Sequence, residues 1–221
     1  MSYLENFAGG LGFDRNDPST ILEKNLPVIN EKGMLMDYGI CHEDFFWSIR
    51  QEPGLVEAFA KVHDTPDLIV SFDNMNIQWP RRPDQKPNVP WPHQDQDPVT
   101  ASQFRCMQGL VNLQPSGPND GGLYVCRGAH LLSEEFHRAF ADEKEKVWSW
   151  THEWYGFTKP GLQWLDDHGC EWIKPCAEPG DLILWDSRTP HQNLTTHWPN
   201  ALHVGGPPVL RNGEPCPPTI S

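Results

Sequence analysis

Prolines and glycines interrupt this sequence so often that long helices are not expected. Its 221 residues include 22 prolines and 18 glycines. A proline inside a helix removes a backbone hydrogen bond and clashes with the preceding turn, which argues against a helical bundle or a coiled coil. Hydrophobic residues nevertheless make up 38% of the chain and ten residues are tryptophan, so a packed core is expected rather than disorder. A chain of this length and composition predicts one globular domain built from short elements and turns.

The apolar segments between the turns have the composition of β-strands. Branched and aromatic residues fill the runs DLIVSFD (67–73), FRCMQGLVNLQP (104–115), LYVCRGAH (123–130) and DLILWD (181–186). A further strand is expected in CEWIKPC, joined to DLILWD through the turn AEPGD. Helical periodicity is largely confined to 43–62, with a break at Pro53, and to an insertion at 133–168. The pattern predicts a mainly β fold with flanking helices, arranged as an antiparallel double sheet or jelly roll.

The charge of the chain excludes several classes of partner. The formal net charge is −13 and the densest basic group is only Arg81-Arg82, so binding to a nucleic-acid backbone or an anionic membrane is not expected. No apolar run approaches the ~18 residues of a membrane span, and the first ten residues do not resemble a secretion signal. The sequence therefore predicts an intracellular, cytoplasmic protein without a nucleic-acid or membrane partner, and leaves its oligomeric state open.

The stretch PWPHQDQDP (90–98) contains the strongest candidate metal ligands. His93 and Asp95 are two positions apart, so both side chains project to the same face of an extended segment. A remote histidine, His191, follows the run DLILWD. Two histidines and one carboxylate are the ligand set of many non-haem Fe(II) oxygenases. His-x-Asp is also common by chance, and the chain has ten histidines, so at this point a polar loop remains an alternative.

Three segments in a fixed order strengthen the metal-site interpretation. They are PWPHQDQ, QGLVNLQPSGPNDGGLYVCRGAH and EPGDLILWDSRTPHQN. Together they resemble the phytanoyl-CoA dioxygenase family of Fe(II)- and 2-oxoglutarate-dependent oxygenases, especially its fungal members of unassigned substrate, over residues 40–193. The resemblance implies a double-stranded β-helix of the cupin-like jelly-roll type. It also implies that His93, Asp95 and His191 are the ligands of Fe(II).

The resemblance further implies an activity and a set of cosubstrate residues. The expected reaction hydroxylates a small organic substrate with O₂, through decarboxylation of 2-oxoglutarate and an iron(IV)-oxo intermediate. Gln94, Gln108 and Asn193 are placed close to 2-oxoglutarate, although each has the alternative of being an ordinary hydrogen-bonded polar residue. Four tryptophans of the insertion are expected either to cover the pocket mouth or to pack against the core, namely Trp148, Trp150, Trp154 and Trp164.

The C-terminus departs from the family pattern. Family members supply a basic residue about ten to fifteen positions after the distal histidine, because a planar cation suits the far carboxylate of 2-oxoglutarate. Here the next basic residue after His191 is Arg211, within GGPPVLRNGEPCPP, and that composition is unsuited to a central strand. We expect a replaced ending from about Thr195, without the last strand of the double sheet. Arg211 is then the candidate for binding 2-oxoglutarate, and Arg188 is an alternative only if it points inward.

These observations predict a single oxygenase-like domain over 1–221. It consists of an N-terminal arm (1–42), a family-like core (43–193) and an atypical tail rich in proline and glycine (194–221). Two alternatives to the oxygenase remain open. One is a catalytically impaired or silent metal-binding relative that has lost 2-oxoglutarate capture. The other is a jelly-roll metalloprotein that uses another divalent ion and no 2-oxoglutarate.

Overall fold

The chain divides into two compact units, which are described separately. The computed structural model describes residues 1–72, 74–79, 82–86, 88–143 and 153–194. Among the described residues, the first unit takes Met1–Val89 with Asp120–Gly122 and Leu194, and the second takes Pro90–Asn119 with Leu123–Asn193, so β5 and β9 each have one end residue in the first unit. Each unit contains its own hydrophobic cluster. The organisation as a single domain with an arm and a tail stays a prediction.

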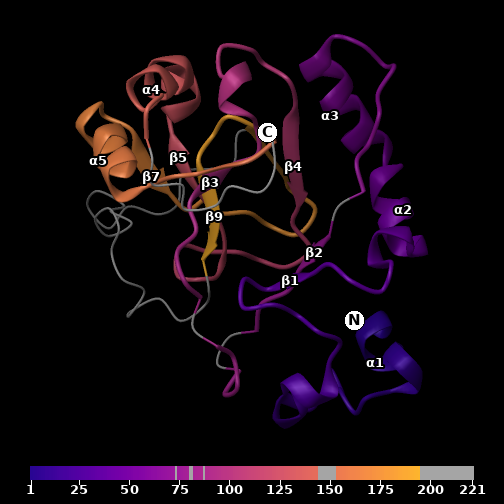
Figure 1. Ribbon diagram of the computed structural model, residues 1–221. Coiled ribbons are helices and arrows are strands. Elements are labelled where there is room, and N and C mark those ends of the chain that lie inside the picture. Colours follow the sequence, from indigo (N-terminus) through magenta and orange to yellow (C-terminus); the bar gives the residue numbers. More distant parts are fainter. Residues whose placement is uncertain (73, 80–81, 87, 144–152, 195–221) are drawn as a thin grey trace. The chain divides into compact units, whose positions relative to one another are not determined.

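The first unit consists of short helices and one short strand pair joined by loops (Figure 1). Its elements are α1 (Ser2–Asn6), β1 (Met34–Leu35), α2 (Asp44–Arg50), α3 (Pro53–His63) and β2 (Met75–Asn76), with β1 and β2 antiparallel. The expected helix break is confirmed, because α2 ends before Pro53 and α3 begins with it. Proline is tolerated there because the first N–H groups of a helix have no intrahelical partner. The core of this unit consists of Leu4, Phe13, Leu26, Leu35, Ile40 and Trp79.

The run DLIVSFD is not the buried strand that its composition predicts. Residues 67–72 form no strand in the part of the chain that the structure describes. Ile69 is 100% exposed, and Val70 and Phe72 are more than half exposed. Branched residues favour an extended backbone, but a strand also needs a neighbour whose N–H and C=O groups it can bond. Because residues 67–72 have no strand partner among the described residues, their composition predicts a strand that does not form.

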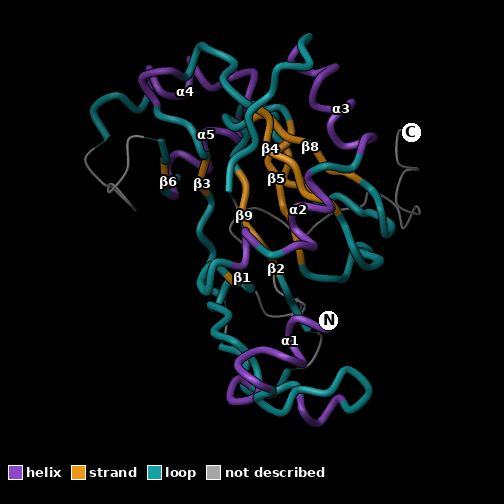
Figure 2. Tube along the Cα trace, turned by 90° about the vertical axis from the view of Figure 1, so that its right-hand side faces the viewer, coloured by secondary structure: helices purple, strands orange, loops and turns teal. Residues whose placement is uncertain are grey.

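The second unit contains two antiparallel sheets among the described residues (Figures 1 and 2). Five strands follow the order β6-β3-β9-β5-β7, and β4 pairs with β8. The strands are β3 (His93–Gln94), β4 (Met107–Val111), β5 (Gly122–Arg127), β6 (Tyr155–Gly156), β7 (Glu171–Ile173), β8 (Leu182–Asp186) and β9 (His191–Leu194). The predicted mainly β fold with flanking helices and antiparallel sheets is thus confirmed. Closure into a double-stranded β-helix stays a prediction.

The strands in CEWIKPC and DLILWD form, but they do not pair with each other. β7 pairs with β5 and β8 pairs with β4, so the two strands belong to different sheets. Between them, Pro175 and Pro179 cannot donate backbone hydrogen bonds, and Ala177 forms an isolated bridge with Ser116. The proline-containing connection therefore carries the chain from one sheet to the other.

Two helices pack together beside β5 in the second unit (Figure 1). They are α4 (Ser133–Ala139) and α5 (Lys159–Asp167). The helix α5 begins after Thr158, whose hydroxyl accepts a hydrogen bond from the Gly161 N–H at 3.2 Å. The shared core consists of Cys126, Ala129, Phe136, Phe157, Leu162, Leu165 and Cys170. This aromatic and aliphatic cluster supports the strands that carry the candidate site.

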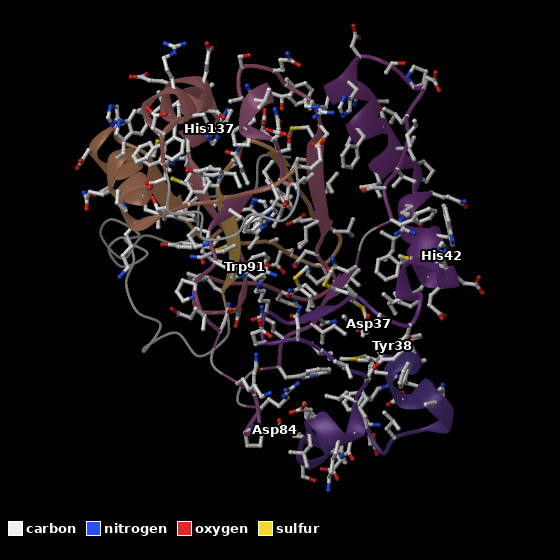
Figure 3. All side chains as sticks on the ribbon, viewed as in Figure 1. Asp37, Tyr38, His42, Asp84, Trp91 and His137 are labelled. Carbon is white, nitrogen blue, oxygen red and sulfur yellow. The ribbon has the colours of Figure 1, made fainter. Side chains whose placement is uncertain are left out.

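The histidine on α4 makes the stability of this unit depend on pH. His137, labelled in Figure 3, packs edge-on against the Phe136 and Tyr155 rings. Burial lowers the pKa of His137 from 6.5 to about 4, although the charge of Asp97 opposes the shift. Below pH 6.5 the unfolded chain therefore binds a proton that the folded chain does not. Stability is fully present above that pH and is lost as the pH falls towards 4.

We expect the free energy of unfolding to fall by up to about 3 kcal/mol across that interval because of His137 alone. The measurement is urea denaturation of the natural chain and of His137→Leu at a series of pH values from about 7 to about 4. The leucine variant should show a shallower pH dependence, because it has no proton to take up on unfolding. Parallel curves for the two proteins would show that another group controls the acid transition.

Candidate metal centre

Strand pairing brings the two predicted histidine ligands together. β3 and β9 are antiparallel neighbours, and His93 lies directly opposite His191 in their register. Prolines at 90, 92 and 190 favour an extended backbone immediately before each strand. Asp95 follows β3, and its backbone N–H donates to the Ser187 carbonyl at 3.1 Å. Residues almost a hundred positions apart are thus placed side by side by backbone hydrogen bonds.

The side chains of His93, Asp95 and His191 form a cluster of metal-binding dimensions. One ligand atom from each residue lies within 4.8 Å of the others. The Asp95 carboxylate is 3.6 Å from Nε2 of His93 and 3.3 Å from Nε2 of His191. Both histidines are buried, whereas Asp95 is partly accessible. The structure therefore brings together all three residues that the sequence singles out, and their binding to a metal stays a prediction.

Backbone carbonyls orient both imidazole rings. Nδ1 of His93 lies 3.0 Å from the Trp91 carbonyl oxygen, and Nδ1 of His191 lies 2.9 Å from the Thr189 carbonyl oxygen. A carbonyl oxygen only accepts hydrogen bonds, so Nδ1 must carry a proton in each ring. The neutral ring then has its lone pair on Nε2, the atom that faces Asp95. Fixing the tautomer through Nδ1 is the usual way in which proteins present histidine to a metal.

Asp95 is held in its charged form. Burial favours the neutral acid. When the two rings are protonated and no metal is bound, a hydrogen bond and the charge of His191, the charge of His93 and a hydrogen bond from Gln108 outweigh burial and lower the pKa of Asp95. Gln108, on β4, donates from Nε2 to the Asp95 carboxylate at 2.6 Å. Gln108 therefore contacts a candidate ligand directly. Its predicted role in binding 2-oxoglutarate stays a prediction.

The other predicted cosubstrate residues have different surroundings. Gln94 is 1% exposed, and its Nε2 donates to the Gln96 carbonyl oxygen at 2.9 Å. It follows His93 directly on β3, so its side chain leaves the opposite face of the strand. Asn193 lies two positions after His191 on β9 and shares its face. Arg211 lies outside the described residues.

Aromatic rings flank His93 on two sides. Its ring is stacked on Trp91 with centroids 4.1 Å apart and on Trp154 with centroids 5.2 Å apart. Figure 3 labels Trp91 next to the strands β3 and β9. Of the four tryptophans in the insertion, Trp154 thus reaches the site. Trp164, on α5, instead packs against the hydrophobic cluster that contains Phe136. Trp148 and Trp150 lie outside the described residues.

Arg188 forms an ion pair away from the cluster. Its Nε and Nη2 donate to the two carboxylate oxygens of Asp186 at 2.9 and 2.7 Å. This planar, two-point contact occupies the edge of the guanidinium formed by Nε and Nη2. Asp97 also has a local role, since its carboxylate accepts from the Val99 N–H at the start of a short 3₁₀ turn.

Trp185 is a site residue that the sequence does not single out. Its ring centroid lies 5.3 Å from that of His191. Trp185 also lies directly opposite Gln108 in the β4–β8 register. Side chains of the β4–β8 sheet therefore reach the cluster that contains His93 on β3 and His191 on β9. The tryptophan is visible in the sequence, but only the strand register shows which face it occupies.

The fold and the cluster define an antiparallel β protein with a candidate His-Asp-His metal centre. Residues 42–197 match the family model for phytanoyl-CoA dioxygenase, PhyH. The chain belongs to the phytanoyl-CoA dioxygenase family.

The chain is also similar to "Ava biosynthesis cluster protein O" of Aspergillus versicolor. The two sequences are 40% identical over 198 residues, covering 87% of this chain and 62% of the relative. The chain thus spans less than two thirds of the length of that protein. No solved structure matches it significantly. Within the described residues, no helix is long and apolar enough to cross a membrane.

Proposed function

We propose that this chain is an Fe(II)- and 2-oxoglutarate-dependent dioxygenase that hydroxylates a small organic molecule. The observation that supports the proposal most directly is the cluster of His93, Asp95 and His191, whose ligand atoms lie within 4.8 Å of one another. Family membership agrees with this chemistry. The name of the relative from Aspergillus versicolor contains the words "biosynthesis cluster", and we extend that context to this chain by proposing a small-molecule substrate.

The donor set fits Fe(II). Two imidazole nitrogens and one carboxylate are the ligands of non-haem iron oxygenases, and they leave coordination positions open for a cosubstrate and O₂. In the proposed site, Fe(II) with 2-oxoglutarate supplies the oxidising power for inserting an oxygen atom into a C–H bond. The carbonyls of Trp91 and Thr189 hold the two imidazoles in their binding tautomer. Gln108 holds the carboxylate of Asp95.

The two tryptophans that stack on His93 protect this ligand in the proposed site. Trp91 and Trp154 cover the two faces of His93. They limit the access of water to that ligand and restrict the rotation of its ring. Exclusion of water protects a reactive site from side reactions and strengthens the interactions within it.

A silent, metal-binding relative is the second candidate, because the described arginines of the second unit are engaged elsewhere. Arg105 pairs with Glu153, Arg127 with Glu171, Arg138 with Glu134 and Arg188 with Asp186. Each of these cations already has a carboxylate of this chain as its partner. We therefore keep Arg211, which lies outside the described residues, as the candidate for the far carboxylate of 2-oxoglutarate.

Turnover of 2-oxoglutarate separates the two candidates. For the dioxygenase, we expect Fe(II)-dependent formation of succinate with consumption of O₂, abolished in His93→Ala and retained in the exposed-surface variant His168→Ala. Substrate candidates are supplied as pooled small molecules, and hydroxylated products are sought by mass spectrometry. Metal binding at His93 without 2-oxoglutarate binding or succinate formation would instead identify the silent relative. Calorimetric titration of the anaerobic, Fe(II)-loaded chain with 2-oxoglutarate, repeated with Arg211→Ala, tests our assignment of Arg211.

A further inference from the structure

Two buried polar atoms beside the metal centre have no protein partner among the described residues. They are Oε1 of Gln108 and Nε1 of Trp185. A buried polar atom without a hydrogen bond costs free energy, and most such atoms in folded proteins have a partner. A ligand group that bonds to both atoms would remove this cost.

The two atoms belong to neighbouring side chains that reach the same site. Gln108 on β4 and Trp185 on β8 are directly opposite in an antiparallel register, so both side chains leave the same face of the sheet. Gln108 bonds to Asp95 at 2.6 Å. The Trp185 ring lies 5.3 Å from the His191 ring, centroid to centroid. Both side chains thus contact the candidate metal ligands.

The orientation of the Gln108 amide follows from its partner. A carboxylate only accepts hydrogen bonds, so the NH₂ group must face Asp95 and Oε1 must be the remaining atom. The indole nitrogen of Trp185 only donates. The pair therefore offers one acceptor and one donor, and both are uncharged.

This combination suits a neutral donor–acceptor group better than a carboxylate. A carboxylate placed on the pair would bond to the indole N–H but has no hydrogen to donate to Gln108 Oε1, whose lone pairs it would meet. A neutral group that both donates and accepts, such as a secondary amide or a hydroxyl, satisfies both atoms.

We propose that Gln108 and Trp185 are specificity-determining residues that bind a neutral amide or hydroxyl group of the organic substrate beside the metal. The inference rests on the proposed function, because it assigns the pair to the substrate of that metal centre. The class of substrate it names is a neutral polar molecule with a donor–acceptor group close to the carbon that reacts.

The indole N–H of Trp185 provides a direct test that does not depend on turnover. The full chain is labelled with ¹⁵N-tryptophan and saturated with Zn(II), and the Trp185 resonance is identified by its loss in Trp185→Phe. Titration with N-methylacetamide or with ethanol should shift this resonance saturably. The probe that binds with the higher affinity shows whether the pair prefers an amide or a hydroxyl group. Sodium acetate can coordinate Zn(II) but cannot donate to Gln108 Oε1, so any shift that it causes should be the same in the natural chain and in Gln108→Met. Gln108→Met should weaken the binding of the neutral probes about tenfold at saturating Zn(II), the loss expected for one buried hydrogen bond.

Matched variants control for indirect effects. Gln163→Met removes a glutamine that also donates to an aspartate, Asp167, but on the exposed surface of α5. Trp172→Phe alters a tryptophan that stacks on Tyr124. Both variants should bind the neutral probe as the natural chain does. The inference is overturned if Gln108→Met weakens acetate binding as much as it weakens binding of the neutral probes, if it leaves binding of the neutral probes unchanged, or if neither neutral probe shifts the resonance.

The same samples separate this inference from the proposed function. Zn(II) binding that is lost in His191→Ala, together with an unmoved Trp185 resonance, would overturn the assignment of the pair and leave the metal centre standing. Failure of the chain to bind Zn(II), Co(II) or Fe(II) through His191 would overturn the proposed function instead.

Discussion

Replacing His191 by alanine is expected to lower the affinity of the chain for a divalent metal ion by more than about 100-fold. Loss of a residue that only supports a metal ligand costs about 10- to 100-fold, and loss of a ligand itself should cost more. His191 is buried, its Nδ1 is fixed by the Thr189 carbonyl, and its Nε2 faces Asp95. Water cannot reproduce this fixed geometry.

Anaerobic titration with Co(II), followed by its visible absorption, measures the affinity without requiring turnover. His168→Ala is the matched control, because His168 is exposed at the end of α5 and lies outside the cluster. Circular dichroism establishes that each variant is folded. Equal Co(II) affinity in the natural chain and in folded His191→Ala would rule out His191 as a ligand.

Leu165→Ala is expected to lower the free energy of unfolding of the second unit by about 2–5 kcal/mol. Leu165 is 1% exposed and packs with Phe136 and Leu162 in the cluster between α4, α5 and β5. Removing its branched end takes apolar surface out of that cluster and leaves a cavity, because the surrounding side chains relax only in part. The measurement is urea denaturation followed by tryptophan fluorescence.

Leu131→Ala is the control for this variant. Leu131 is the same residue type in the same unit and is 78% exposed, so its truncation should change the stability by less than about 0.5 kcal/mol. A Leu165→Ala variant as stable as Leu131→Ala would show that the cluster is not the core of the unit. Equal metal affinity in the natural chain and in Leu165→Ala below its unfolding transition would show that the strands keep their register.

The success and failure of the strand predictions have the same physical origin. The runs containing β4, β5 and β8 are apolar, are bounded by turn residues and find antiparallel partners. The run at 67–72 has the same composition, but it forms no strand and exposes Ile69 completely. Local sequence controls the preference for extended backbone, whereas a strand exists only when another segment completes its hydrogen bonds. The separation of β7 and β8 into different sheets follows the same rule.

The sequence by itself determined the type of fold and the chemical identity of the candidate ligands. Its prolines and glycines argued against long helices, and the spacing of His93 and Asp95 placed two donors on one face. The resemblance of three segments to the phytanoyl-CoA dioxygenase family singled out His191 as their partner. None of these inferences required long-range coordinates, because each depends on local backbone preference, on residue type or on that resemblance.

Only the tertiary structure decided which atoms meet. The β3–β9 register sets His93 against His191, and the β4–β8 register brings Gln108 and Trp185 to the same site. The tertiary structure also places Trp154 against His93. These contacts join segments up to about a hundred residues apart, and such contacts depend on how the strands align across the whole unit. A shift of one residue in either register would turn these side chains to the opposite face, although the sequence would be unchanged.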